Sequence, residues 1–209
     1  MEFRKATDVF GEWAAFGKDV GMEKVHRETV VPFLSTFAFP ESFSFLDFGC
    51  GNGWVVQKIA QMSACTRAVG FDGAPAMIER AKKKKQFQKE EYVLGDLLDW
   101  ETEERFDVIF SMEALYYAVP MEPAVDKLVR LLSPGGQIVV GTNYFEENAS
   151  SHTWPTDLHV RMDRRSIQSW KDMLVSAGLL NVTQKPVYSP NPKDSGKHGT
   201  LFTMGRFEL

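Results

Sequence analysis

The chain has 209 residues, of which 44% are hydrophobic and 25% charged, as expected for one globular α/β domain with its own core. Its formal net charge of −4 argues against binding nucleic acid mainly through phosphates, and its two cysteines can form neither a disulfide framework nor a metal site. The first ten residues are charged and lack an apolar stretch, and the sequence contains no membrane-length apolar run, so we expect a cytoplasmic protein without a secretory signal or a membrane partner. We also expect a monomer or homodimer without nucleic-acid or metal partners.

Residues 1–40 precede the first expected strand and predict a helical cap. Apolar residues at helical spacing predict a helix that runs up to Phe16, and a second helix that Pro32 kinks or ends. Trp13, Phe16 and His26 either pack against the sheet or border a bound ligand. Both interpretations stay open for Trp13, whereas His26 is better explained as a structural or solvated side chain.

The most informative stretch is an apolar strand over 43–48 that runs into three glycines, Gly49, Gly51 and Gly53, with a helical pattern directly behind them. Glycine is needed where the chain turns sharply or lets a ligand lie against bare backbone. A helix N-terminus adds unpaired N–H groups and a positive dipole end, which suits a polar, partly anionic small molecule. The dinucleotide fingerprint would need a third glycine where Trp54 stands, which argues against an NAD-linked oxidoreductase.

An acid, Asp47, lies two residues before this Gly-x-Gly-x-Gly turn. The arrangement resembles the nucleotide-binding loop of class I S-adenosylmethionine-dependent methyltransferases. The resemblance implies an α/β fold, a three-layer Rossmann-like sandwich whose seven-stranded, mostly parallel sheet has the order 3-2-1-4-5-7-6 with the last strand antiparallel. It also implies S-adenosyl-L-methionine as cofactor, S-adenosyl-L-homocysteine as product, and cofactor contacts from Asp47, Gly49, Cys50, Gly51, Asn52 and Gly53.

Asp72 ends the next short strand, 67–71, and lies 19 residues beyond Gly53. An acid at the tip of the neighbouring strand can accept hydrogen bonds from both ribose hydroxyls of an adenosine. The alternative is a plain surface carboxylate. Gly73 and Met77 follow in the next predicted helix, and Met77 either lies beside the adenine or packs in the core.

A third strand over 91–94 leads into Asp96 and Leu97. In the family that this chain resembles, an acid at this point and its neighbour's backbone face the adenine amino group. A carboxylate can accept from an exocyclic amino group, so Asp96 is the expected partner. Asp99 is a nearby competitor.

The fourth strand, 106–110, is a nearly continuous apolar run, which is typical of a parallel sheet buried on both faces. It continues into Ser111, Met112 and Glu113, at the strand end where open α/β sheets bind ligands. We therefore expect Ser111 and Met112 beside the cofactor. Relatives that methylate nucleobase amino groups carry an Asn/Asp-Pro-Pro-Tyr/Phe motif here, which this chain lacks, so the acceptor stays open.

The stretch 143–165 is much longer than the ~2–6 residues usual between a strand and a helix. It is rich in polar and aromatic residues, which is typical of a lid or a substrate surface. We expect the other elements of the second half to be a helix over 122–132 stopped by Pro134, a strand over 137–142, a helix over 167–177, a strand from 182, a turn-rich excursion over 190–196, and a last strand over 200–207.

The reaction implied by the resemblance is in-line transfer of a methyl group from a sulfonium. The leaving group departs as a neutral thioether, so the protein mainly positions the nucleophile and excludes water. A general base is needed only where the acceptor must lose a proton. The candidate bases are Glu113, His152 and Tyr116.

We therefore predict one methyltransferase domain over 1–209, made of the cap over 1–40 and a Rossmann-like core over 41–209 with the substrate-side loop 143–165. The predicted acceptor is a small molecule that offers an O, N, S or C nucleophile. The alternatives are a methyltransferase acting on a protein side chain, a non-catalytic cofactor-binding regulatory or partner module, and aminopropyl transfer from the same sulfonium.

Overall fold

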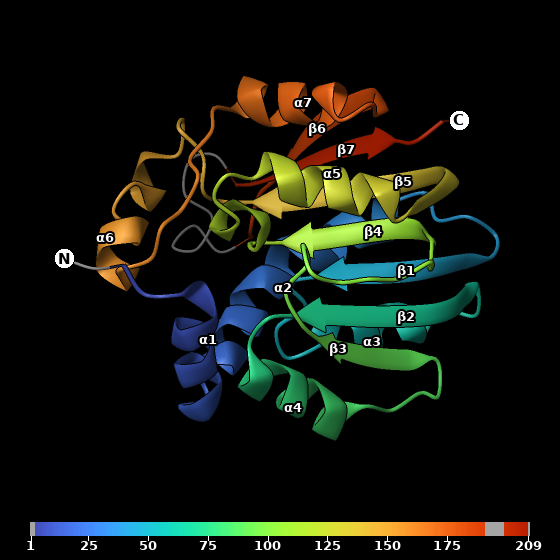
Figure 1. The fold of residues 1–209 in the computed structure, drawn as a ribbon, viewed down its shortest axis with the longest axis horizontal. Coiled ribbons are helices and arrows are strands. Elements are labelled where there is room, and N and C mark those ends of the chain that lie inside the picture. Colours follow the sequence, from blue (N-terminus) through green and yellow to red (C-terminus); the bar gives the residue numbers. More distant parts are fainter. Residues whose placement is uncertain (1–2, 191–198, 209) are drawn as a thin grey trace.

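A computed structural model describes residues 3–190 and 199–208 of the chain. It has a seven-stranded sheet in the order β3-β2-β1-β4-β5-β7-β6 (Figure 1), which confirms the predicted topology. Strands β1 to β5 pair in parallel, and β7 is antiparallel to both of its neighbours, β5 and β6. The strands are β1 Phe43–Phe48, β2 Cys65–Asp72, β3 Glu90–Leu94, β4 Phe106–Met112, β5 Leu132–Thr142, β6 Leu180–Val187 and β7 Thr200–Arg206.

Helices cover both faces of the sheet. Side chains of α2, α3 and α4 pack on one face, and those of α5 and α7 pack on the other. Helix α1 packs against α4, and the short helices η1, η2 and α6 lie in the connections. The helices are α1 Ala6–Ala15, α2 Lys18–Thr36, α3 Trp54–Ala60, α4 Pro75–Lys84, η1 Leu115–Tyr117, α5 Glu122–Arg130, η2 Ala149–Ser151, α6 Trp154–Leu158 and α7 Ile167–Ser176.

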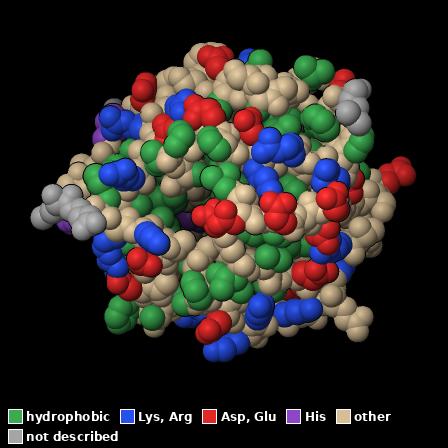
Figure 2. Space-filling view, viewed as in Figure 1, with side chains coloured by type: hydrophobic (Ala, Val, Ile, Leu, Met, Phe, Trp, Pro, Cys, Tyr) green, Lys and Arg blue, Asp and Glu red, His purple; other side chains and the backbone are tan. Residues whose placement is uncertain are grey.

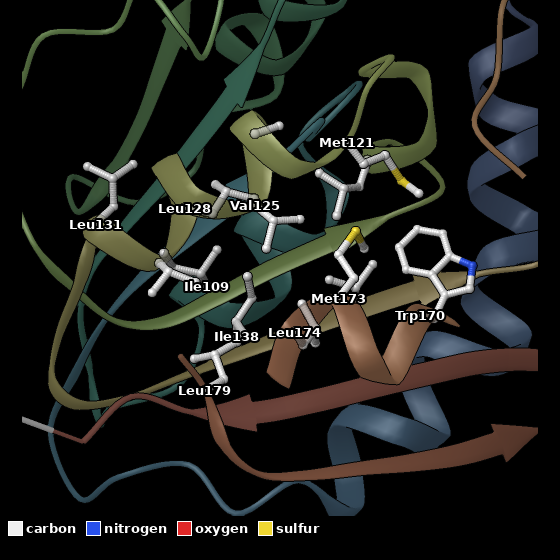
Figure 3. Packing of buried hydrophobic residues seen from close by; sticks show 14 of the residues in the cluster. Ile109, Met121, Val125, Leu128, Leu131, Ile138, Trp170, Met173, Leu174 and Leu179 are labelled. Carbon is white, nitrogen blue, oxygen red and sulfur yellow. The ribbon is translucent and has the colours of Figure 1, made fainter. Parts of the chain in front are cut away.

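Successive side chains of each apolar strand pack alternately into the two helical layers, because they point to opposite faces of the sheet. Ile109 of β4 and Ile138 of β5 pack against α5 and α7, as Figure 3 shows, together with Trp170 and Met173 of α7. Val108, the residue before Ile109, belongs to the opposite cluster with α2 and α3. Burial of each such side chain contributes about 1.5–3 kcal/mol, so both layers hold the sheet rigidly.

The carboxyl ends of the parallel strands gather at one edge of the sheet. In Figure 1 the arrowheads of β2 and β4 point toward α1 and α6, which lie beyond that edge. The backbone N–H of Arg4 donates to the carbonyl of His159 over 2.7 Å, and Arg4 forms a parallel bridge with Val160. The N-terminal segment is thus fastened to the residues after α6, and the two segments lie beyond the carboxyl ends of the strands.

The structure corrects two expectations and leaves one outside its range. Pro32 does not end the second helix, since α2 continues to Thr36. The lost hydrogen bond is offset by burial beyond the proline, where Phe33 stacks on Phe202 at a centroid distance of 4.0 Å. The stretch 143–165 contains η2 and α6 and is therefore not a plain loop. The turn-rich excursion falls largely on 191–198, outside the described residues. Within the described residues, no helix is both long and apolar enough to cross a membrane.

Candidate functional site

A pocket of about 1300 Å³ opens at the carboxyl ends of the strands. Its walls come from α1, α2, the glycine turn, the ends of β2, β3 and β4, η1 and α6. Figure 2, in the same view as Figure 1, shows a hollow left of the centre of the molecule, with hydrophobic side chains around it and acidic side chains beside it. Pockets for one drug-sized ligand are usually about 300–1,000 Å³, so this one has room for a nucleoside and a second molecule.

The three glycines of the turn all have positive φ, at 74°, 53° and 78° for Gly49, Gly51 and Gly53. A Cβ on Gly49 would lie 2.1 Å from the Cβ of Ala114, and one on Gly53 would lie 2.7 Å from the ring of Tyr92. A Cβ on Gly51 would meet only the sulfur of Met77, at 4.0 Å. Two of these glycines therefore allow close packing, whereas Gly51 keeps the backbone open to the pocket.

Two carboxylates, Asp47 and Asp72, line the pocket near the glycine turn. Asp72 accepts hydrogen bonds from the backbone N–H groups of Gly51, over 2.9 Å, and Ala74, over 2.8 Å. Burial raises the pKa of both carboxyls, and the charge of Asp72 raises that of Asp47 further. A ligand that brings hydroxyl donors or a positive charge to this end of the pocket would relieve both effects.

Beyond Asp72 the wall continues with Gly73 and Met77, and then with Asp96 and Leu97 after β3. Asp96 accepts a hydrogen bond from the backbone N–H of Leu98 over 3.0 Å, which fixes its carboxylate at the rim. The competitor Asp99 does not line the pocket. Apolar side chains beside one carboxylate are suited to a flat base with an amino group.

The N-terminal cap is tied to the glycine turn through a contact that sequence reasoning missed. The side-chain amide of Asn52 donates to Asp19, over 3.0 Å, and to Glu23, over 2.9 Å. The guanidinium of Arg27 lies 4.6 Å from the ring centre of Trp54, which is the residue at the third-glycine position. The signal in the sequence was the spacing of Asp19, Glu23 and Arg27, four residues apart along one face of a helix.

Two residues of the cap that the sequence singled out reach the pocket, and one does not. Trp13 of α1 lines it, with Phe10 edge-on at 5.3 Å. His26 of α2 also lines it, and desolvation lowers the pKa of this imidazole to about 4, so the ring is neutral at pH 7. Phe16 is 78% exposed and faces away.

The far end of the pocket is built around Glu113, which directly follows β4 with a positive φ of 54°. Its Oε2 accepts a hydrogen bond from the hydroxyl of Tyr116 over 2.8 Å, and its Oε1 accepts one from the backbone N–H of Asn143. Desolvation raises the pKa of Glu113 to about 7, and burial beside that carboxyl raises the pKa of Tyr116. A carboxyl with this pKa can accept and release a proton near neutral pH.

A family model of a methyltransferase domain matches residues 46–140, which include the glycine turn, Asp72 and Glu113. A chain in a solved complex of the Haloferax volcanii Trm112 methyltransferase activator with a protein described as a methyltransferase superposes with a TM-score of 0.89, at 28% identity over 99% of both chains. The chain is thus similar to class I S-adenosylmethionine-dependent methyltransferases in sequence and in fold. The N-methyltransferase NodS of Bradyrhizobium japonicum WM9, solved with S-adenosyl-L-homocysteine, shares the fold, with a TM-score of 0.64 and 24% identity over 90% of this chain and 85% of that one.

Two curated methyltransferases are also similar in sequence. The trans-aconitate 2-methyltransferase of Acidovorax sp. strain JS42 is 26% identical over 165 residues, which are 73% of this chain and 63% of that protein. The sterol 24-C-methyltransferase of Clavispora lusitaniae is 33% identical over 121 residues, which are 54% of this chain and 32% of that protein. The chain thus spans less than two thirds of the length of either relative.

S-adenosylmethionine is the cofactor of this methyltransferase family, and the residues present fit it. The backbone at Gly51 is open to the pocket, and the carboxylate of Asp72 lies beside it, bonded to the Gly51 N–H. Asp47 also lines the pocket, and burial together with the charge of Asp72 raises its pKa. A sulfonium nucleoside brings ribose hydroxyls, which can donate hydrogen bonds to these carboxylates, and a positive charge, which the carboxylates attract.

The structure brings most of the predicted site residues of the chain together, but not all of them. Gly53 and Ser111 do not line the pocket, since Gly53 packs against Tyr92 and Ser111 is fully buried. His152 also lies outside it, exposed on the surface, with its Nε2 2.8 Å from the carbonyl oxygen of Glu146. The other predicted residues that line the pocket are Trp13, Asp47, Gly49, Cys50, Gly51, Asn52, Asp72, Gly73, Met77, Asp96, Leu97, Met112, Glu113 and Tyr116.

Proposed function

We propose that the chain transfers the methyl group of S-adenosyl-L-methionine to a small-molecule acceptor. The observation that carries this proposal is one continuous pocket with a donor end at the glycine turn and Asp72, and an acceptor end at Glu113 and Tyr116. The bound donor supplies an electrophilic methyl carbon on a sulfonium and leaves as a neutral thioether. The residues of the chain position both molecules and exclude water.

At the donor end, each wall of the pocket suits one part of the nucleoside. The carboxylate of Asp72, at the tip of β2, accepts hydrogen bonds from the ribose hydroxyls. Asp96, Leu97 and Met77 hold the adenine. The backbone around Gly51, with Trp13 opposite in the cap, receives the amino-acid end.

At the acceptor end, Glu113 is the proposed general base, and Tyr116 orients its carboxylate. A pKa of about 7 suits this role, because the carboxylate form is abundant at neutral pH and still basic enough to take a proton. Tyr116 itself stays protonated, since burial raises the pKa of its phenol. His152 has no part in the proposal because it lies outside the pocket.

A small acceptor is favoured over a macromolecule because the N-terminal segment and the residues after α6 together cover the acceptor end. The relatives named for trans-aconitate and sterol methylation also act on small molecules. A non-catalytic binding module would need no space beyond the donor, whereas this pocket extends to Trp154 and Asp157. Methylation of a protein side chain and aminopropyl transfer are alternatives that the test below separates.

Calorimetric titration with S-adenosyl-L-homocysteine, and with NAD as control, tests the donor end. A metabolite extract incubated with the chain and isotopically labelled methyl donor, then analysed by mass spectrometry, tests the transfer. We expect the chain to bind S-adenosyl-L-homocysteine and not NAD, and at least one small product to gain a labelled methyl group. Label found only in protein, transfer of the aminopropyl group, or no transfer would contradict the proposal.

We further propose that the chain binds an activator protein of the Trm112 kind. The support is the match along 99% of both chains to a protein solved in complex with that activator. Co-expression with Haloferax volcanii Trm112 and light scattering after size exclusion would test it. A 1:1 complex is the expected result, whereas elution of the chain alone, as a monomer or homodimer, would contradict the proposal.

A further inference from the structure

Aromatic rings line the acceptor end of the pocket around one carboxylate. Tyr116 and Tyr117 of η1 have ring centres 4.5 Å apart, and Phe10 of α1 lies edge-on to Tyr117 at 5.1 Å. Trp154 of α6 adds a further face to the lining. Aromatic faces carry partial negative charge and attract cations such as ammonium groups, most strongly where water is excluded.

Within the described residues, the carboxylate of Glu113 accepts hydrogen bonds only from neutral groups. These are the hydroxyl of Tyr116 and the backbone N–H of Asn143. Each carboxylate oxygen can accept more than one hydrogen bond, so both retain capacity toward the pocket. A carboxylate held by neutral donors beside aromatic rings would be stabilised by a cation at hydrogen-bond distance.

The charges of the pocket wall also discriminate among acceptors. Acidic side chains outnumber basic ones along the lining, and within the part of the chain that the structure describes the basic ones are Arg4, Lys5 and Arg161. Arg4 is paired with Glu12, and Arg161 lies over the ring of Phe3 at 5.6 Å. An anionic acceptor would therefore meet like charge at Glu113, whereas a cationic one would meet complementary groups.

We propose that the acceptor is a primary or secondary amine, which binds as its ammonium form against Glu113 and the rings of Tyr116, Tyr117 and Trp154. This inference rests on the methyl transfer proposed above. It assigns Glu113 two tasks, to attract the ammonium group and to remove the proton that blocks its lone pair.

Glu113 takes one proton from R–NH₃⁺, and the free nitrogen lone pair forms a bond to the methyl carbon while the bond from that carbon to sulfur breaks. Sulfur keeps the electron pair, which gives a neutral thioether, and the product leaves as R–NH₂⁺–CH₃. The positive sulfonium nearby favours loss of the amine proton, because it repels the ammonium charge.

The amine assignment is testable without knowing the metabolite. A metabolite extract is split, and one half is treated with N-hydroxysuccinimidyl acetate and then hydroxylamine, which blocks primary and secondary amines and frees hydroxyl groups. Both halves are incubated with the chain and isotopically labelled methyl donor. We expect labelled product in the untreated half and at least a 20-fold loss in the blocked half.

Labelled product that survives the blocking would overturn the amine assignment and leave the proposed methyl transfer intact. No labelled product in either half, with S-adenosyl-L-homocysteine binding retained, would overturn the proposed transfer and the amine assignment with it. The two failures are thus distinguishable in one experiment.

The role of Glu113 is tested with Glu113→Gln and the surface control Glu41→Gln. At pH 7 we expect Glu113→Gln to transfer methyl groups at least 100-fold more slowly than the unmodified chain. Its affinity for S-adenosyl-L-homocysteine should stay within twofold, and Glu41→Gln should change neither quantity. As the pH is raised toward the pKa of the amine, the rate of Glu113→Gln should rise by about tenfold per pH unit. The reason is that the fraction of amine already deprotonated in solution rises by the same factor. A rate unchanged by Glu113→Gln, or a loss that higher pH does not restore, would overturn this role.

Discussion

The two ends of the pocket are built differently. The donor end is centred on the backbone of one contiguous turn, in which Gly49 packs against Ala114 and Gly51 stays open, and the carboxylate of Asp72 accepts a hydrogen bond from the Gly51 N–H. The acceptor end is made by side chains from η1, α1 and α6, which lie far apart in the sequence. A short motif can therefore build the proposed donor end, whereas the proposed acceptor end depends on contacts that only the folded chain assembles.

The largest expected effect separates packing from binding within the donor end. Gly49→Ala should destabilise the chain by about 4 kcal/mol, since its Cβ would collide with that of Ala114 at a positive φ. Gly51→Ala should keep more of the stability and lose affinity for S-adenosyl-L-homocysteine. Urea unfolding and calorimetric titration measure the two effects.

The control is Gly11→Ala in α1, where an added Cβ meets nothing within 4 Å. It should be neutral or stabilising by up to about 1 kcal/mol, as alanine replaces glycine inside a helix. Equal stability for Gly49→Ala and Gly11→Ala would remove the packing role assigned to this part of the turn.

The next effect concerns stability at the acceptor end. The pKa of Glu113 is raised to about 7 in the folded chain, so the folded state holds a proton that the unfolded state has lost. Stability should therefore fall as pH rises from about 4.5 to about 7, by on the order of 3 kcal/mol from this group. Glu113→Gln should remove that fall and be the more stable chain at pH 8.

Unfolding of both chains in urea at pH 5 and pH 8 measures this difference directly. Taking the difference between the two chains separates Glu113 from Asp47 and Asp72, whose pKa values are raised as well. A variant that loses as much stability as the unmodified chain over this pH range would show that Glu113 does not ionise as described.

Asp72→Asn tests the donor end through affinity. The substitution replaces a charged acceptor of ribose hydroxyls with a neutral amide, which should weaken S-adenosyl-L-homocysteine binding by about 2 kcal/mol, or about 30-fold. Asp99→Asn is the matched control, since Asp99 does not line the pocket. Similar dissociation constants for the two variants would mean that ribose binding does not depend on Asp72.

The smallest effect concerns the link between the cap and the turn. Asn52→Ala removes the amide that bonds to Asp19 and Glu23, and should cost about 1–2 kcal/mol of stability. Gln168→Ala is a control on α7, where an exposed amide bonds to Asp172. Hydrogen exchange should rise in α2 only for Asn52→Ala, and an unchanged α2 would contradict the link.

Much of the donor end could be predicted from the sequence because its determinants are local. Glycines at alternate positions after an apolar strand, and Asp72 at the tip of the next strand, indicate both the turn and its ligand. Ser111 was predicted at the cofactor from its strand-end position alone, yet it is fully buried, since the pleat of β4 turns it away from the pocket.

The rest depended on long-range packing, which local patterns do not encode. Pro32 was expected to kink or end a helix, and it does not end it, because burial of the residues beyond it carries α2 onward to Thr36. His152 lies in the predicted substrate-side stretch, yet the path of that stretch through η2 leaves it on the surface. The spacing of Asp19 and Glu23 indicates one face of a helix but not that this face meets Asn52, which lies about 30 residues away in sequence.

We propose that one pocket holds the donor at Asp72 and presents its reactive sulfur to Glu113. A crystal structure of the chain with S-adenosyl-L-homocysteine bound tests it most directly. We expect the ribose hydroxyls to hydrogen-bond to Asp72 and the sulfur atom to face Glu113 and Tyr116. A ribose placed away from Asp72, or a sulfur atom turned away from Glu113, would contradict the account.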